Sequence, residues 1–137
     1  MVTGKDIVNK AYYWDGKPYI FGYEVDLDDP APRAADCSEM VQWTVHQCGL
    51  YIPDGAIYQY RYCRNHDRLI SVSTAIRTAG ALLFVIDGDH RHVGISIGNG
   101  RTIECRGKKY GCGQFDAYRF WTHGGLIPGV EYPKREG

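Results

Sequence analysis

Apolar residues recur at intervals of three and four in the first half of the chain, which is the spacing of helices with one buried face. Residues 3–13 predict a first helix, because Thr3 can cap its start and Asp6 follows three residues later. After a turn, residues 19–23 predict a short extended segment. The acidic, proline-bearing residues 24–32 have too few apolar side chains for a core and predict a surface loop.

A second helix is predicted to begin after Asp36, because this residue can cap it and Glu39 stands at the capping-box position. Apolar residues continue at helical spacing until Gly49, where we expect the helix to end. In the less regular stretch that follows, residues 56–63 suit a short helix, and residues from 73 or 74 to 78 suit a single turn.

From residue 80 onward the pattern changes to short apolar or alternating runs separated by turns, which predicts strands. The predicted strands are 80–86, 92–97 and 101–106, with two more near 114–121 and 126–132, and the main turns are 87–89 and 108–113. Helices followed by an antiparallel sheet predict an α+β fold with the second helix packed on the sheet. The length suits one domain over residues 1–137.

The composition narrows the classes of function. Sixteen basic residues balance 16 acidic ones, so no overall field attracts nucleic acid or an anionic membrane. The longest apolar run, residues 80–86, is far shorter than the ~18 residues of a membrane span. The N-terminus lacks the charged and apolar regions of a signal peptide, so we expect synthesis in the cytoplasm and another delivery route for any work outside it.

The five cysteines are an odd number without a Cys-x-x-Cys pair. This argues against a disulfide framework and against a four-cysteine zinc site. Cys48 falls on the predicted buried face of the second helix and is expected to be a small core residue. Cys63, Cys105 and Cys112 could pair in an oxidising setting, although nothing in the sequence favours it.

Cys37 has the clearest potential for chemistry. It stands in the first turn of the predicted second helix, where the positive end of the helix dipole favours a thiolate. His92 follows 55 residues later on a predicted strand and could supply the base that forms the thiolate. His92 shares its face of the strand with Gly94 and Ser96, which we expect to leave room for the end of the helix.

A third polar group would orient the imidazole by accepting its second N–H, and Glu104 on the adjoining strand is the best candidate. Its position depends on the loop before it. A two-residue turn at Asn99 and Gly100 would place Glu104 on the face opposite His92, whereas a three-residue loop at 98–100 would make the two side chains diagonal neighbours. The triad hypothesis therefore predicts an odd-length loop or a bulge.

Stabilisation of an oxyanion would need two donors. The backbone N–H of Cys37 is one, and Tyr19 or the nearby loop could supply the second. Asp36 and Glu39 place negative charge near the sulfur and oppose a low thiol pKa. We expect the His92 imidazolium and the helix dipole to outweigh them.

Two other patterns have competing interpretations. His90 and His92 could be metal ligands on one strand face, but zinc needs more ligands and the nearby acidic residues lie in a turn, so we assign no metal or cofactor. The basic residues 106–111 are interpreted as a solvated hairpin tip in preference to a contact with substrate carboxylates.

Successive segments resemble the motifs of the NlpC-type papain-like cysteine peptidases. These are GKPYIFG at 16–22, DCS at 36–38, GALLF at 80–84 and HVGISIGNGRTIE at 92–104. With GLIPG at 125–129 the likeness is to the phage and phage-tail-associated branch. The match runs in order over roughly residues 5–130, and the DCS and HVGI blocks together make it specific.

The resemblance implies a papain-like α+β fold and cleavage of a peptide or amide bond in the stem peptides of bacterial cell walls, often next to a D-glutamyl or diaminopimelyl residue. By position, Cys37 would be the nucleophile, His92 the general base and acid, and Glu104 the orienting group. The residues implied in substrate binding or in the oxyanion site are Tyr19, Asp36 and Ser38.

Three residues depart from the family's pattern. Ala81 replaces a usual acidic residue, Glu39 replaces a usual glycine, and Glu104 stands where many members carry histidine. Glu104 keeps a proton-accepting side chain, whereas Glu39 lies near the expected substrate groove and leaves the bond specificity open.

The implied partner is the peptidoglycan stem peptide. The missing signal peptide suits a phage lysin, a tail-associated hydrolase or a toxin delivered by a secretion machine, which would act on the wall after lysis or delivery. Two alternatives are an acyltransferase or amidase of the same superfamily, and a non-catalytic cell-wall-binding or phage-tail module.

Overall fold

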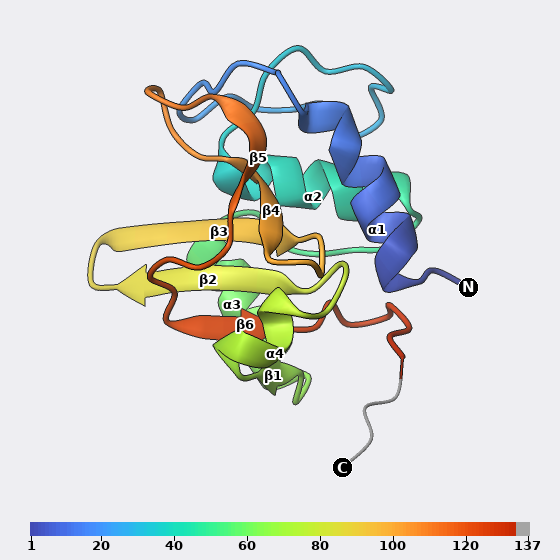
Figure 1. Cartoon of the computed structure of the whole chain (residues 1–137). Coiled ribbons are helices and arrows are strands. Elements are labelled where there is room, and N and C mark those ends of the chain that lie inside the picture. Colours follow the sequence, from blue (N-terminus) through green and yellow to red (C-terminus); the bar gives the residue numbers. More distant parts are fainter. Residues whose placement is uncertain (134–137) are drawn as a thin grey trace.

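The computed structural model of the protein describes residues 1–133, and Figure 1 shows its course. The helices are α1 (Gly4–Ala11), a 3-10 turn (Tyr12–Trp14), α2 (Cys37–Gln47), α3 (Ala56–Asn65) and α4 (Val72–Ile76). The strands are β1 (Leu69–Ile70), β2 (Leu82–Asp87), β3 (His90–Ser96), β4 (Arg101–Cys105), β5 (Cys112–Asp116) and β6 (His123–Gly125). Among the described residues, no helix has the length and apolar character needed to cross a membrane.

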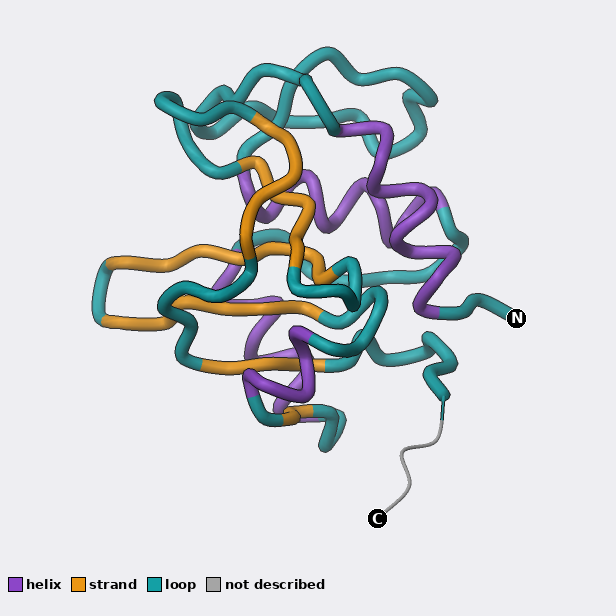
Figure 2. The backbone as a smooth tube through the Cα atoms, in the orientation of Figure 1, coloured by secondary structure: helices purple, strands orange, loops and turns teal. Residues whose placement is uncertain are grey.

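The strands form one six-stranded antiparallel sheet in the order β1-β6-β2-β3-β4-β5. In Figure 1, β2, β3 and β6 lie side by side beneath α2, whereas β4 and β5 turn steeply away from them and rise beside α2. The long loops gather at the same end of the molecule, beyond β4 and β5 (Figure 2). The predicted α+β fold is confirmed.

Each face of the sheet has its own core. Phe84, Val93 and Ile95 pack with residues of α1, α2 and α3 in the larger cluster, and Val85 packs with α4 in the smaller one. His92 is the register partner of Val85, and successive strand residues alternate between faces. The His92 side chain therefore points to the face opposite the one that carries α2. The first turn of α2 reaches the edge of β3 beside it, where the N–H of Val93 bonds to the Cys37 sulfur and β4 no longer pairs with β3.

The predicted helix starts are confirmed. The hydroxyl of Thr3 accepts a hydrogen bond from the N–H of Asp6 at 3.2 Å, and the Asp6 carboxylate accepts the N–H of Thr3 at 2.9 Å. Asp36 caps α2, and the chain leaves that helix through Gly49, whose φ is +84°. The short segments predicted from 56 and 73 correspond to α3 and α4.

The strands before residue 106 confirm the predicted ones with small shifts at their ends, but the last part of the chain differs. The strand predicted near 114–121 stops at Asp116, and the strand predicted near 126–132 is wrong. Pro128 has no N–H for a ladder, and Gly129 takes a φ of +90° in a turn closed by the Val130 N–H and the Ile127 carbonyl at 3.1 Å. The sheet instead gains the short β6 and β1, neither of which the pattern indicated.

The turn between β3 and β4 decides where Glu104 lies. Ile95 pairs with Ile103 and Ser96 with Thr102, and the N–H of Ile97 bonds to the carbonyl of Arg101 at 2.9 Å. This register leaves residues 98–100 as a three-residue loop, the alternative that places Glu104 on the face of His92. The odd-length loop required by the triad hypothesis is therefore present.

The structure contains a disulfide, which the sequence did not favour. Cys105 and Cys112 are opposite each other on β4 and β5 and form a disulfide. Cys63 is buried and Cys48 is partly buried against the larger core, and both are free. The pairing that the sequence left open is thus the one between Cys105 and Cys112, because the β4–β5 register brings their side chains together.

Candidate active site

Cys37 is placed by the first turn of α2. The Asp36 carboxylate accepts the N–H of Glu39 at 2.9 Å, and the Asp36 carbonyl accepts the N–H of Met40 at 3.1 Å. Asp36 therefore fixes the start of the helix through both its side chain and its backbone. The backbone N–H groups of Cys37 and Ser38 are directed at the Cys37 sulfur. Such N–H groups have no partner within the helix, and they favour negative charge beside them.

The expectation of a low thiol pKa is wrong for this arrangement. Burial raises the pKa of the Cys37 thiol to about 11. The N–H of Val93, which bonds to the sulfur, opposes this rise, and the Asp36 carboxylate adds to it. Desolvation outweighs the helix dipole here, so a thiolate at neutral pH requires a base that takes the thiol proton.

His92 is held by Glu104. The Nε2 atom of His92 lies 2.6 Å from Oε1 of Glu104, and the Glu104 side chain is fully buried while His92 is partly exposed. A carboxylate at this nitrogen selects the tautomer that carries its proton on Nε2. The other ring nitrogen, Nδ1, is then the one able to accept a proton.

Arg119 is a member of this hydrogen-bond network that the sequence did not indicate. Its Nη2 atom donates to Oε1 of Glu104 at 2.5 Å and its Nη1 atom to Oε2 at 2.6 Å, and the Thr102 hydroxyl also donates to Oε2. Burial alone would favour the neutral acid, but the hydrogen bonds from Arg119 and His92 lower the pKa of Glu104 to about 2. Glu104 is therefore a carboxylate throughout the neutral range.

Trp121 packs against both His92 and Arg119. Its ring stacks on that of His92 with centroids 5.9 Å apart and planes 16° apart, and the Arg119 guanidinium lies 4.5 Å from its centroid. Gly94 makes room for this group, since an added Cβ there would lie 2.6 Å from Glu104 and 3.5 Å from Trp121. The prediction that Gly94 makes space for the end of α2 is wrong, because α2 packs on the other face.

Cys37 and His92 open into one cleft of about 450 Å³. The residues that line it are Tyr19, Cys37, Val85, His90, Arg91, His92, Arg106, Arg119 and Phe120. Three arginines and no carboxylates are on this surface, although the whole chain has no net charge. Arg106 thus lies in the cleft, whereas Lys108 and Lys109 at the tip of the same hairpin are exposed as predicted.

Tyr19 reaches the cleft from the loop before α2. It forms an isolated bridge with Ala35, and the N–H of Ile20 bonds to the Ala35 carbonyl at 3.1 Å, so the segment is fixed next to Cys37. Burial, and then the nearby Cys37 and Asp36, raise the pKa of the Tyr19 hydroxyl. Tyr19 is therefore a neutral hydroxyl beside the sulfur.

Asp36 and Ser38 flank the sulfur but do not line the cleft. The second carboxylate oxygen of Asp36 accepts the N–H of Gly22 at 3.3 Å, which ties the loop to the helix. Ser38 is buried, and its carbonyl accepts a hydrogen bond from Gln59 of α3 at 2.9 Å. Both residues hold the start of α2 in place.

Glu39 does not complete the capping box that its spacing suggests. Its carboxylate accepts the N–H of Val25 at 3.1 Å, and the side chain is buried near Asp54. Burial, and then a hydrogen bond with Asp54, raise the pKa of Glu39 to about 8. This carboxyl is thus largely uncharged at neutral pH and fixes the 22–26 loop, outside the lining of the cleft.

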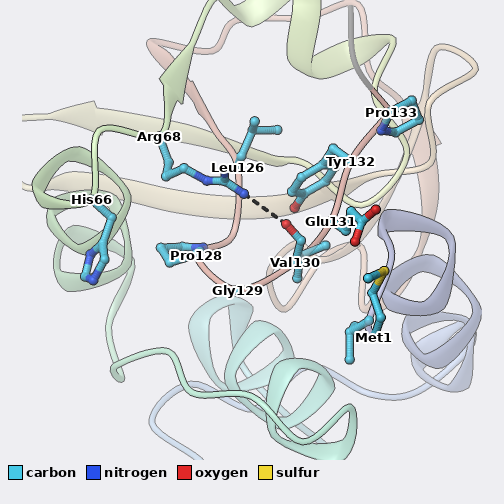
Figure 3. A pocket seen from close by; sticks show the side chains of 11 residues that line it. Met1, His66, Arg68, Leu126, Pro128, Gly129, Val130, Glu131, Tyr132 and Pro133 are labelled. Carbon is cyan, nitrogen blue, oxygen red and sulfur yellow. Dashed lines mark hydrogen bonds between the residues drawn. The ribbon is translucent and has the colours of Figure 1, made fainter.

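A larger pocket of about 790 Å³, lined in part by Met1, Val2 and residues 128–133, contains no cysteine. Figure 3 shows Arg68 crossing it, with a hydrogen bond of 2.9 Å to the Val130 carbonyl. Its lining offers no nucleophile paired with a base, so the smaller cleft is the candidate site. Within residues 1–133, no three His, Cys, Asp or Glu side chains gather closely enough to hold a metal ion.

The NlpC/P60 family matches residues 11–123. The bifunctional muramidase/DL-endopeptidase CwlT of Bacillus subtilis is 31% identical over 100 residues, which are 69% of this chain and 27% of that protein. This chain therefore spans little more than a quarter of its curated relative.

Solved structures agree with this match. The NlpC/p60 domain of the peptidoglycan hydrolase SagA is 28% identical, with a TM-score of 0.74 over 92% of this chain and 100% of that one. The P60 domain of an antigen from M. avium subspecies paratuberculosis is 26% identical, with a TM-score of 0.75 over 94% and 96% of the two chains. The papain-like α+β fold implied by the motifs is confirmed.

Proposed function

The chain belongs to the NlpC/P60 family, and from this membership we propose that it is a cysteine peptidase that cleaves a peptide or amide bond in the stem peptide of bacterial peptidoglycan. One observation carries the proposal: a single cleft contains Cys37 at the start of a helix and His92 bonded to a buried carboxylate. The family's known hydrolases support the choice of polymer, since SagA is named a peptidoglycan hydrolase and CwlT a DL-endopeptidase.

The reaction begins with transfer of the Cys37 thiol proton to Nδ1 of His92, because Nε2 is bonded to Glu104. The sulfur then attacks the scissile carbonyl carbon. The resulting oxyanion is stabilised by the N–H of Cys37 at the positive end of α2, with the neutral Tyr19 hydroxyl as the second donor.

The second half of the reaction uses the same histidine as an acid and then as a base. The proton on Nδ1 passes to the leaving amine as the C–N bond breaks, which leaves a thioester on Cys37. Water attacks the thioester and gives a proton to His92. As the C–S bond breaks, His92 returns that proton to the Cys37 sulfur, and the acid product departs.

The charge of the cleft supports an acidic peptide as the substrate. Neither Arg91 nor Arg106 has a carboxylate within salt-bridge distance in residues 1–133. Arg106 packs on the rings of Tyr110 and Phe115, and Arg91 donates its Nε–H to the Gly88 carbonyl, so the charge of each is left for a ligand carboxylate to balance. Diaminopimelate-type stem peptides carry free carboxylates near their isopeptide bonds, and arginine is well suited to bind them. The proposed substrate is therefore a stem peptide whose carboxylates are not amidated.

Mass spectrometry of the products tests this proposal. Wild type and Cys37→Ala would be incubated with purified diaminopimelate-type stem peptides, with and without an added acceptor amine. We expect two fragments whose masses sum to the substrate plus water, and no fragments with the variant. Capture of the acceptor in place of water would instead identify an acyltransferase, and intact substrate with the wild type would leave a binding module.

Action on the cell wall after lysis, or after delivery by a phage tail or a secretion machine, is part of the proposal. The Cys105–Cys112 disulfide supports it, because such bonds persist in oxidising surroundings and are rare in a reducing cytoplasm. The balance of charges gives no reason to invoke nucleic acid or an anionic membrane as a partner.

A further inference from the structure

We propose that Arg119 is a positioning residue for the reaction, because it fixes the carboxylate that holds His92 and balances its charge; this inference rests on the proposed function. The sequence gives it no obvious role. It lies beyond the end of β5, in a segment without strand pairing, and yet it touches the member of the site that is most deeply buried.

The Glu104 carboxylate is held by donors on both oxygens. Oε1 accepts from His92 at 2.6 Å and from Arg119 at 2.5 Å, and Oε2 accepts from Arg119 at 2.6 Å and from the Thr102 hydroxyl. A planar guanidinium bonded to both oxygens prevents the carboxylate from rotating. The direction of the bond to His92 is therefore set by Arg119.

Arg119 is itself anchored. Its Nη1 atom also donates to the Asp116 carbonyl at 3.1 Å, and its guanidinium lies on Trp121. The indole N–H of Trp121 donates to the Ala117 carbonyl at 2.9 Å, and the ring stacks on His92. The guanidinium and the imidazole thus share one rigid indole as a support.

The charge of Arg119 has a predictable effect on the cysteine–histidine pair. A lone buried carboxylate would stabilise the imidazolium, and a protonated His92 cannot accept the Cys37 proton. Arg119 offsets that charge, so the Glu104 carboxylate orients the ring without leaving an unbalanced negative charge beside it. The charged and titratable groups that face His92 are Glu104 from β4, Cys37 from α2, Arg119 from the segment after β5, and Tyr19, His90, Arg91 and Arg106 around the cleft.

The test uses two variants. Arg119→Met keeps the length of the side chain and removes its charge, and Arg119→Lys keeps the charge but cannot bond to both carboxylate oxygens as the guanidinium does. Hydrolysis of a stem peptide and alkylation of Cys37 by iodoacetamide would both be followed against pH. With Arg119→Met we expect hydrolysis at pH 7 to fall roughly 10- to 100-fold and the acidic limb of both profiles to move up by about one pH unit. Arg119→Lys should restore the position of the limb and only part of the rate.

Chemical rescue and a matched variant separate positioning from stability. Added guanidinium, at concentrations too low to unfold the protein, should raise the rate of Arg119→Ala several-fold, because the guanidinium site opens to the cleft. It should have no effect on Arg101→Met, which removes an exposed arginine from β4. Unmoved pH profiles for Arg119→Met together with no rescue would overturn the proposal.

The alkylation profile also separates two kinds of failure. If wild type cuts no stem peptide, the proposed function is wrong, and the shift of the alkylation profile still decides the role of Arg119. If Arg119→Met does not fold, the comparison of Arg119→Lys with wild type decides the role of Arg119. Loss of the two-point hydrogen bond without loss of charge should lower the rate at an unchanged pH midpoint.

Discussion

The two sides of the cleft are built in different ways. On the side of α2, Cys37 is placed by contacts within one helical turn, since Asp36 and the N–H that it caps are three residues apart. On the side of the sheet, His92 depends on Glu104, 12 residues away, and Glu104 depends on Arg119, a further 15 residues along. The position of the proposed nucleophile is thus set by local sequence, and that of the proposed base by tertiary contacts.

This difference has a chemical counterpart. The α2 side offers uncharged donors and a thiol whose pKa is raised to about 11 by burial. The sheet side carries the charges, in a buried carboxylate bound by an arginine. In the proposed mechanism the α2 side thus contributes the thiol, and the sheet side contributes the base and the groups that orient it.

Among changes to the sheet side, removal of the His92 imidazole should cause the largest loss of activity. We expect His92→Ala to lower the rate of stem-peptide hydrolysis by about 1,000-fold, because His92 is the proposed acceptor of the Cys37 proton. His90→Ala is the matched control, since His90 shares the strand face and lines the cleft without a carboxylate partner. A similar loss in both variants, measured by product release, would contradict the assignment.

Glu104→Gln keeps the shape of the side chain and removes its charge. We expect activity to fall by about 10- to 100-fold, because an amide cannot fix the tautomer of His92 as a carboxylate does. The folded pKa of Glu104, about 2, lies below its ordinary 4.5, so its stabilisation is present above pH 4.5 and is lost as the pH falls toward 2. Acid unfolding followed by circular dichroism should therefore be shallower in this variant over that range, and an unchanged slope would contradict the ion pair.

The disulfide ties the strand of Glu104 to its neighbour on the sheet side. It closes a short loop between Cys105 and Cys112, and we expect reduction, or the pair of changes to serine, to cost about 2 kcal/mol of stability. Urea unfolding with and without a thiol reductant measures this. Cys48→Ser is the control, because Cys48 is free, and a midpoint that does not respond to the reductant would exclude the bond.

The smallest effects should come from the two helix caps. Thr3→Ala and Asp36→Ala each remove one cap, and each should cost about 1 kcal/mol in urea unfolding. Only Asp36→Ala should also lower hydrolysis, by roughly tenfold, because only that cap positions the nucleophile. Equal activity of the two variants would mean that the start of α2 does not need its cap for catalysis.

The predictions from the sequence succeeded where one short pattern determines the structure. The caps at Thr3 and Asp36 are read from residues that lie within one turn, and the alternation after residue 80 correctly indicates β2, β3 and β4. The choice between two hairpin loops before Glu104 needed the register, and both remained open until the structure fixed it.

The sequence failed where several distant segments cooperate. The sheet partner β6 carries two glycines and little apolar pattern, so it has no strand signal of its own. Arg119 stands in an irregular segment, where an arginine is usually solvated, and only tertiary contacts place it on Trp121 and against Glu104. The spacing of Cys105 and Cys112 around a predicted turn was the available signal for their disulfide, because residues that face each other across a hairpin can be bridged.

The most direct test of the account is the release of new amino groups from purified diaminopimelate-type peptidoglycan by wild type, Cys37→Ala and Cys48→Ala. The two cysteines stand at opposite ends of α2, and both are free. The account predicts equal release by wild type and Cys48→Ala, and a rate at least about 10,000-fold lower for Cys37→Ala. Release that survives in Cys37→Ala, or that is absent from the wild type, would contradict it.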